Sequence, residues 1–179
     1  MRKFNAILTA LIMVLFLLHA VFGAMELVGA GYNAMKIAAR VCFVLVVVHT
    51  VIGIKLTIDT LRVSRRTGVS YFRENRLFWA RRISGLAIMI LLCFHMFAFG
   101  KTIGGVYQLK PFTTVKLAAQ IMLVLSIALH VLANIRPALN AFGARGLKQH
   151  AGDILIVLSV ILLIFIIAFI IYYLRWHAI

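Results

Sequence analysis

The chain has 179 residues, of which 64% are hydrophobic, and it carries a formal net charge of +15. A soluble domain is nearer half apolar, so this composition excludes an ordinary soluble globular protein and indicates an integral membrane protein. The Lys and Arg residues flank apolar segments and form no continuous basic stripe. This distribution argues against nucleic-acid binding and for charges that orient helices in a membrane.

Five apolar segments are each long enough to cross a bilayer, which needs about 20 residues in a helix. The predicted fold is therefore an all-α, integral membrane five-helix bundle that forms one domain over residues 1–179. We expect the helices over about residues 5–26, 35–60, 82–100, 113–135 and 151–175.

The connections are predicted from charge and from prolines. Residues 60–82 are expected to form a long arginine-rich loop, and residues 101–112 an outer turn. Pro111 and Pro137 are expected at segment ends, where helices can stop. Cys42 and Cys93 lie inside apolar segments and are interpreted as buried small hydrophobic side chains.

The first segment has an alternative interpretation. Two basic residues precede it, and residues 21–24, VFGA, would also suit a signal-peptide cleavage site. We favour a membrane span as the interpretation of this segment, which holds one histidine, His19.

Topology is predicted from the positive-inside rule, under which Lys and Arg gather on the cytoplasmic side of a membrane. With the N-terminus in the cytoplasm and the C-terminus outside, twelve basic residues flank the inner ends of the segments and six flank the outer ends. The inner residues are Arg2, Lys3, Arg62, Arg65, Arg66, Arg73, Arg76, Arg81, Arg82, Arg136, Arg145 and Lys148. The outer residues are Lys36, Arg40, Lys101, Lys110, Lys116 and Arg175.

The third segment contains His95 within a stretch, residues 83–100, that carries no formal charge. An imidazole in hydrocarbon is costly without a partner, so an intramembrane histidine marks a candidate functional site. Ser84 and Arg81 lie within about 40° of His95 around a helix. A basic group, a hydroxyl, leucines and an imidazole on one face would suit a planar, mostly apolar ligand with acidic substituents, such as haem.

Each of the first four segments carries one histidine: His19, His49, His95 and His130. At ~1.5 Å per residue, the first and third lie about 8–9 Å from the outer boundary, and the other two lie nearer the inner side. Histidines at equal depth on facing helices can supply both axial nitrogens to a haem iron. The alternative is that each histidine hydrogen-bonds a neighbouring helix.

The pattern therefore predicts two b-type haems, one held by His19 and His95 and the other by His49 and His130. Iron with two protein ligands has no open position for a substrate, so the predicted role is electron transfer. Arg81 or Arg82, with Ser84, are candidates to bind the carboxylates of the inner haem, and Lys116 those of the outer haem. An equally good interpretation of Arg81 and Arg82 is that they only orient the helix in the membrane, in line with the positive-inside rule.

One histidine on each of the first four of five helices, with RRISG at residues 81–85, resembles the dihaem cytochrome b subunit of succinate:quinone and quinol:fumarate oxidoreductases. The resemblance covers most of the chain and implies the same histidine pairs. It implies a membrane anchor in an oxidoreductase complex, with no dicarboxylate active site of its own. It further implies menaquinone or another quinone as redox partner, and flavoprotein and iron–sulfur subunits on the cytoplasmic face of a bacterial membrane.

The resemblance also suggests Glu26 as a carboxylate at a quinone site, and residues 60–82, with Trp79, as the docking surface for the partner subunits. Ala128 stands where some members have a glutamate, which puts a proton route there in doubt. Two alternatives stay open. One is the cytochrome b of a hydrogenase or formate dehydrogenase complex, and the other is a haem-free membrane scaffold or transporter.

Overall fold

The computed structural model describes residues 2–30, 36–68, 76–103, 106–141 and 150–178 of the chain. Among these residues, five helices are long and apolar enough to cross a membrane, which confirms the prediction of five helical segments of membrane-spanning length. The helices are α1 (Arg2–Leu27), α2 (Lys36–Thr67), α4 (Arg76–Ala98), α5 (Thr114–Ala141) and α6 (Ala151–His177).

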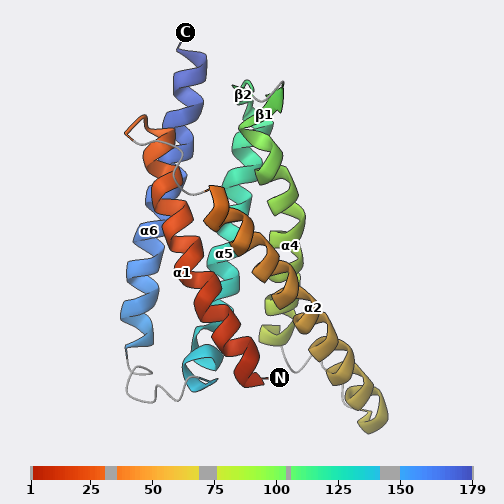
Figure 1. Cartoon of the computed structure of the whole chain (residues 1–179). Coiled ribbons are helices and arrows are strands. Elements are labelled where there is room, and N and C mark those ends of the chain that lie inside the picture. Colours follow the sequence, from red (N-terminus) through yellow and green to blue (C-terminus); the bar gives the residue numbers. More distant parts are fainter. Residues whose placement is uncertain (1, 31–35, 69–75, 104–105, 142–149, 179) are drawn as a thin grey trace.

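Successive helices alternate in direction, and the two chain ends lie at opposite ends of the bundle (Figure 1). Helices α4 and α5 share the most extensive contact, and α6 packs against α5 and α1. Helix α2 packs mainly on α1 and diverges from the other helices toward its C-terminal end. Which end of the bundle faces the cytoplasm stays a prediction from the charge distribution.

A buried apolar cluster lies between α5, α6 and the segment that joins α4 to α5. It includes Phe112, Val124, Phe165 and Phe169. Many large apolar side chains elsewhere are exposed, and Ile37 and Val115 are each 77% accessible. A large exposed apolar surface is typical of a protein that faces lipid.

The prediction of an arginine-rich loop over residues 60–82 is wrong for most of these residues. Helix α2 continues to Thr67, and α4 already begins at Arg76. The sequence between residues 60 and 67 contains no glycine or proline to interrupt the helix. The helix ends at Gly68, whose φ of +69° is a left-handed conformation that glycine adopts without steric cost.

Helix α4 is followed by a small β-hairpin instead of a simple turn. Strand β1 (Gly100–Ile103) pairs antiparallel with β2 (Val106–Leu109), and Ile103 lies opposite Val106. Two glycines separate these strands in the sequence, and such a pair is a strong hairpin signal. The hairpin lies at the same end of the bundle as the C-terminus (Figure 1).

Two further expectations are wrong. Pro137 lies inside α5, which continues past it to Ala141. Cys93 is exposed on α4, and Cys42 is half-buried. An apolar segment predicts hydrocarbon surroundings for a side chain, but in a lipid-facing helix those surroundings are lipid and not protein.

Candidate functional site

The structure brings the four intramembrane histidines together in two pairs. The rings of His19 on α1 and His95 on α4 have centroids 5.9 Å apart and planes at 86°. The rings of His49 on α2 and His130 on α5 have centroids 6.4 Å apart and planes at 85°. These are the two pairs that depth along the helices predicted. Their role as metal ligands stays a prediction.

The spacing of both pairs fits a shared metal ion. A metal–imidazole bond is about 2 Å long and a ring nitrogen lies roughly 1.1 Å from its ring centre, so two axial imidazoles have centres about 6.2 Å apart. The observed separations of 5.9 Å and 6.4 Å lie close to that value. A porphyrin provides the four remaining nitrogens to its iron, so a histidine pair supplies what a haem needs from the protein.

His95 is held by Gln120, a residue of α5 that has 0% exposure. The amide Oε1 of Gln120 lies 2.7 Å from Nδ1 of His95. An amide oxygen only accepts hydrogen bonds, so Nδ1 of His95 must donate its hydrogen to this oxygen. The other ring nitrogen, Nε2, then carries a lone pair, which is the state that a metal ligand requires.

His130 is held in a similar way by Ser84 of α4. The Ser84 hydroxyl lies 2.6 Å from the carbonyl oxygen of Ala80 and donates its hydrogen to it. The same hydroxyl oxygen lies 3.1 Å from Nδ1 of His130 and accepts the hydrogen of that nitrogen. Nε2 of His130 therefore also carries a lone pair. Ser84 thus contacts the histidine, and its contact with a haem carboxylate stays a prediction.

Gly85 allows His130 to approach α4 closely. A Cβ atom added at Gly85 would lie 3.3 Å from Cε1 and 3.5 Å from Nδ1 of His130. Ser84 and Gly85 together thus form the surface of α4 against which the imidazole of α5 rests. This contact is a physical reason for the SG dipeptide within RRISG.

His49 lacks a bond of this kind in the part of the chain that the structure describes. Nδ1 of His49 is buried and has no hydrogen-bond partner among the described residues.

The ring of His95 also contacts the ring of Phe99, with 5.5 Å between the two centroids. Phe99 stacks on Phe112 at 5.5 Å and contacts Tyr172 at 5.9 Å, so aromatic side chains close this end of the bundle beside the first pair.

Arg81 contacts the backbone of α5, and its role at a haem carboxylate stays a prediction. Its Nε donates a hydrogen bond of 2.9 Å to the carbonyl oxygen of Ala133. That oxygen would normally accept from the N–H four residues later, but the residue there is Pro137, which has none. Arg81 therefore satisfies a buried acceptor that Pro137 leaves unpaired, and it links α4 to α5.

Replacing Arg81 by methionine is therefore expected to destabilise the protein by about 1 kcal/mol. The loss should be smaller in a Pro137→Ala background, where the alanine N–H can pair with the carbonyl oxygen of Ala133. Thermal unfolding of the four proteins of this double-mutant cycle in detergent measures the coupling. Equal losses in both backgrounds would show that the two residues do not share this acceptor.

Arg82 is the better candidate for an acidic substituent. Its guanidinium lies 5.0 Å from the centroid of the Phe78 ring, and its Nη1 lies 3.8 Å from a Cβ built at Gly53 of α2. Its Nε is buried, and no described residue accepts a hydrogen bond from it. A half-buried cation with an unused donor suits an anionic group that binds between α2 and α4.

The remaining predicted residues lie away from the histidines or have other contacts. Lys116, at the start of α5, donates through Nζ to the carbonyl oxygen of Pro111. Glu26 is exposed in the last turn of α1. Trp79 is half-buried in the first turn of α4. The structure thus gives Lys116 a local partner, and leaves its proposed contact with a haem carboxylate, like the proposed role of Glu26, a prediction.

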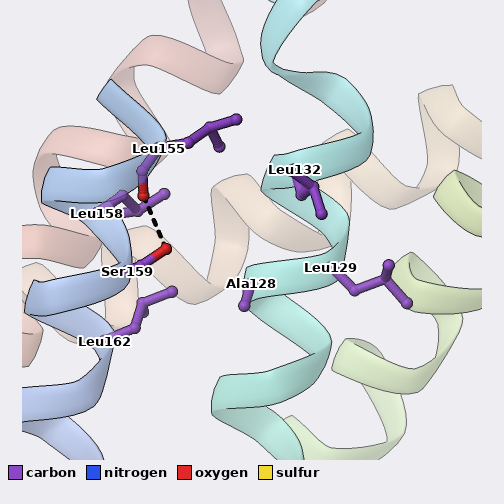
Figure 2. A pocket seen from close by; sticks show the side chains of 7 residues that line it. All are labelled: Ala128, Leu129, Leu132, Leu155, Leu158, Ser159 and Leu162. Carbon is purple, nitrogen blue, oxygen red and sulfur yellow. Dashed lines mark hydrogen bonds between the residues drawn. The ribbon is translucent and has the colours of Figure 1, made fainter. Parts of the chain in front are cut away.

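A separate apolar groove lies between α5 and α6 (Figure 2). Its volume is about 260 Å³, and it is lined by Ala128, Leu129, Leu132, Leu155, Leu158, Ser159 and Leu162. The only polar side chain of this lining, Ser159, donates its hydrogen to Leu155 on its own helix. Ala128 and Leu132 are two residues from His130 on either side, so they point to the opposite face of α5. The groove is therefore not part of the histidine site.

Gln120 and Gly85 are functional candidates that sequence reasoning missed. Gln120 is a polar side chain inside an apolar segment, and a buried amide in such a segment marks a site in the same way as a histidine does. Gly85 carries no comparable signal, because its role depends on which side chain of the neighbouring helix lies opposite.

Comparisons with protein-family models, curated proteins and solved structures found no match to this chain.

Proposed function

We propose that this chain is the dihaem cytochrome b subunit of a quinone-linked oxidoreductase of the succinate dehydrogenase or fumarate reductase type. In this role it anchors flavoprotein and iron–sulfur subunits to the membrane and conducts electrons between them and menaquinone or another quinone. The observation that carries the proposal is the pairing of four histidines from four membrane helices at a spacing suited to two axial ligand pairs.

The Nδ1 bonds of His95 and His130 join α4 to α5, as simple interhelical hydrogen bonding also would. What favours haem is that these bonds leave Nε2 of both histidines for a ligand, in pairs whose ring centroids are 5.9 Å and 6.4 Å apart. Haem bound by two histidines transfers single electrons and has no free iron position for a substrate. Arg82 offers an unpaired donor to an acidic haem substituent.

The basic ends of α2 and α4 support a docking role for the end of the bundle predicted to face the cytoplasm. Arg62, Arg65 and Arg66 on α2 and Arg76 on α4 are exposed. We propose that these side chains attract an acidic surface of the partner subunit. Glu26, exposed at the opposite end of α1, is the proposed carboxylate of the quinone site.

The absorption spectrum of the purified full chain tests the proposal. We expect b-type haem bands that sharpen on reduction, and a pyridine haemochrome assay that gives about two haems per chain. A folded, monodisperse preparation without haem, also after haem is added during refolding or expression, would contradict the proposal and favour the membrane scaffold. Identification of the co-purifying subunits then separates this role from the hydrogenase and formate dehydrogenase alternatives.

A further inference from the structure

Gln120 and Ser84 occupy equivalent positions in the two histidine pairs. Each is hydrogen-bonded to Nδ1 of one histidine. Oε1 of Gln120 lies 2.7 Å from Nδ1 of His95, and Oγ of Ser84 lies 3.1 Å from Nδ1 of His130. Both side chains are almost completely buried, with 0% and 2% exposure. Each pair thus has one histidine whose far nitrogen is hydrogen-bonded to a side chain of the facing helix.

The two acceptors differ in strength. The amide oxygen of Gln120 has a short, direct bond to His95, and no other hydrogen bond reaches that oxygen among the described residues. The Ser84 hydroxyl makes a longer bond to His130 while it donates to Ala80. A stronger acceptor at Nδ1 makes Nε2 more basic, and a more basic ligand favours oxidised iron. The two pairs would therefore hold iron with unequal ligand basicity.

We propose that Gln120 and Ser84 are positioning residues that set the reduction potentials of the two haems independently, through His95 and His130 respectively. This inference rests on the proposed function. Gln120 lowers the potential at the His19–His95 pair because its oxygen accepts strongly from Nδ1 of His95. Ser84 has a weaker effect of the same sign at the His49–His130 pair.

Burial makes each bond effective. In an apolar, water-poor interior no solvent competes for Nδ1 of His95, so removal of the Gln120 acceptor leaves this ring hydrogen without a partner. The amide Nε2 of Gln120 is itself buried and has no hydrogen-bond partner among the described residues. An amide with an unpaired end contributes little net stability. The single bond from His95 is therefore the contact that explains its place in α5.

Four variants of the full-length protein test the proposal by spectroelectrochemical titration at one fixed pH. Gln120→Leu removes the acceptor and should make one of the two transitions more positive. Gln120→Glu keeps the shape, strengthens the acceptor, and should make the same transition more negative. Ser84→Ala should shift the other transition to more positive potential. Leu123→Ala, a buried apolar change one turn along α5, is the packing control and should shift neither.

We expect the shift in Gln120→Leu to be roughly tenfold or more in the one-electron equilibrium constant, which is 59 mV per factor of ten. In the Gln120→Leu, Ser84→Ala double variant the two shifts should add, because the pairs are separate. Opposite signs for the Leu and Glu variants are the signature that a purely structural role for Gln120 would not produce.

The outcomes separate this inference from the proposed function. Wild-type protein without haem overturns both. Wild-type protein with two haems, but with transitions that are unchanged in both Gln120 variants or shifted in the same direction, overturns the role of Gln120 alone. If Gln120→Leu fails to assemble, the Glu variant and Ser84→Ala still decide. Shifts of both transitions by Ser84→Ala would show that the two pairs are not tuned independently.

Discussion

Alanine at His95 is expected to reduce the haem content from about two per chain to about one, and alanine at His130 should do the same. Each change removes one axial nitrogen from one pair and leaves the other pair intact, since the pairs join different helices. The pyridine haemochrome assay, normalised to protein, measures the result. Loss of a protein ligand commonly costs the site its metal, because the second histidine alone holds it weakly.

Double variants make the pairing itself testable. His19→Ala with His95→Ala should leave about one haem, because both changes fall on one pair. His19→Ala with His49→Ala should leave none, because each pair then lacks one member. Pairing of His19 with His49 would exchange these two outcomes, and pairing of His19 with His130 would leave no haem in either double variant.

His150 and His177 are matched controls outside the paired sites. At the start of α6, Nδ1 of His150 lies 3.2 Å from Oδ2 of Asp153. At its end, Nδ1 of His177 forms a hydrogen bond with the carbonyl oxygen of Tyr173. Alanine at either position should leave the haem content at the wild-type level. A loss of haem in these controls would mean that the assay reports general instability and not ligation.

Valine at Gly85 should empty the His49–His130 site while the His19–His95 site keeps its haem. Even a single Cβ would lie 3.3 Å from the His130 ring, so the larger side chain must displace that imidazole or separate α4 from α5. Overpacking of this kind typically costs about 1–3 kcal/mol. We expect the haem content to fall by half, and the transition sensitive to Ser84→Ala to disappear from the redox titration.

Gly85→Ala should give an intermediate result, because a displacement of a few tenths of an ångström accommodates one methyl group. Gly152→Ala on α6 is the matched control, since a Cβ there meets no other atom within 4 Å. Both changes replace a helical glycine by alanine, so a difference in haem content between them reports the contact with His130. Equal haem content in Gly85→Val and wild type would contradict the role of Gly85.

The amino-acid sequence alone determined the membrane class, the five spanning segments and the two sets of histidines at matched depth. These features follow from composition and from the regular rise of a helix, which places each residue along the membrane without reference to its neighbours. The same reasoning predicted the pairs His19–His95 and His49–His130 that the structure brings together.

Local pattern was less reliable at the ends of helices. A high density of arginine suggested a loop over residues 60–82, but charge does not prevent helix formation where no glycine or proline intervenes. Pro137 suggested a helix end, but the helix continues past it, and Arg81 donates to the carbonyl oxygen of Ala133 that Pro137 leaves without its usual donor. Arginine density and a single proline were therefore poor guides to where a helix ends.

Only the tertiary structure decided which residues hold the histidines. Gln120 reaches His95 and Ser84 reaches His130 across the interface between α4 and α5, and Gly85 matters solely because an imidazole lies opposite it. Helical periodicity gives the face and the depth of a residue on its own helix. It does not give the rotation of one helix against the next, which depends on how all their side chains pack together.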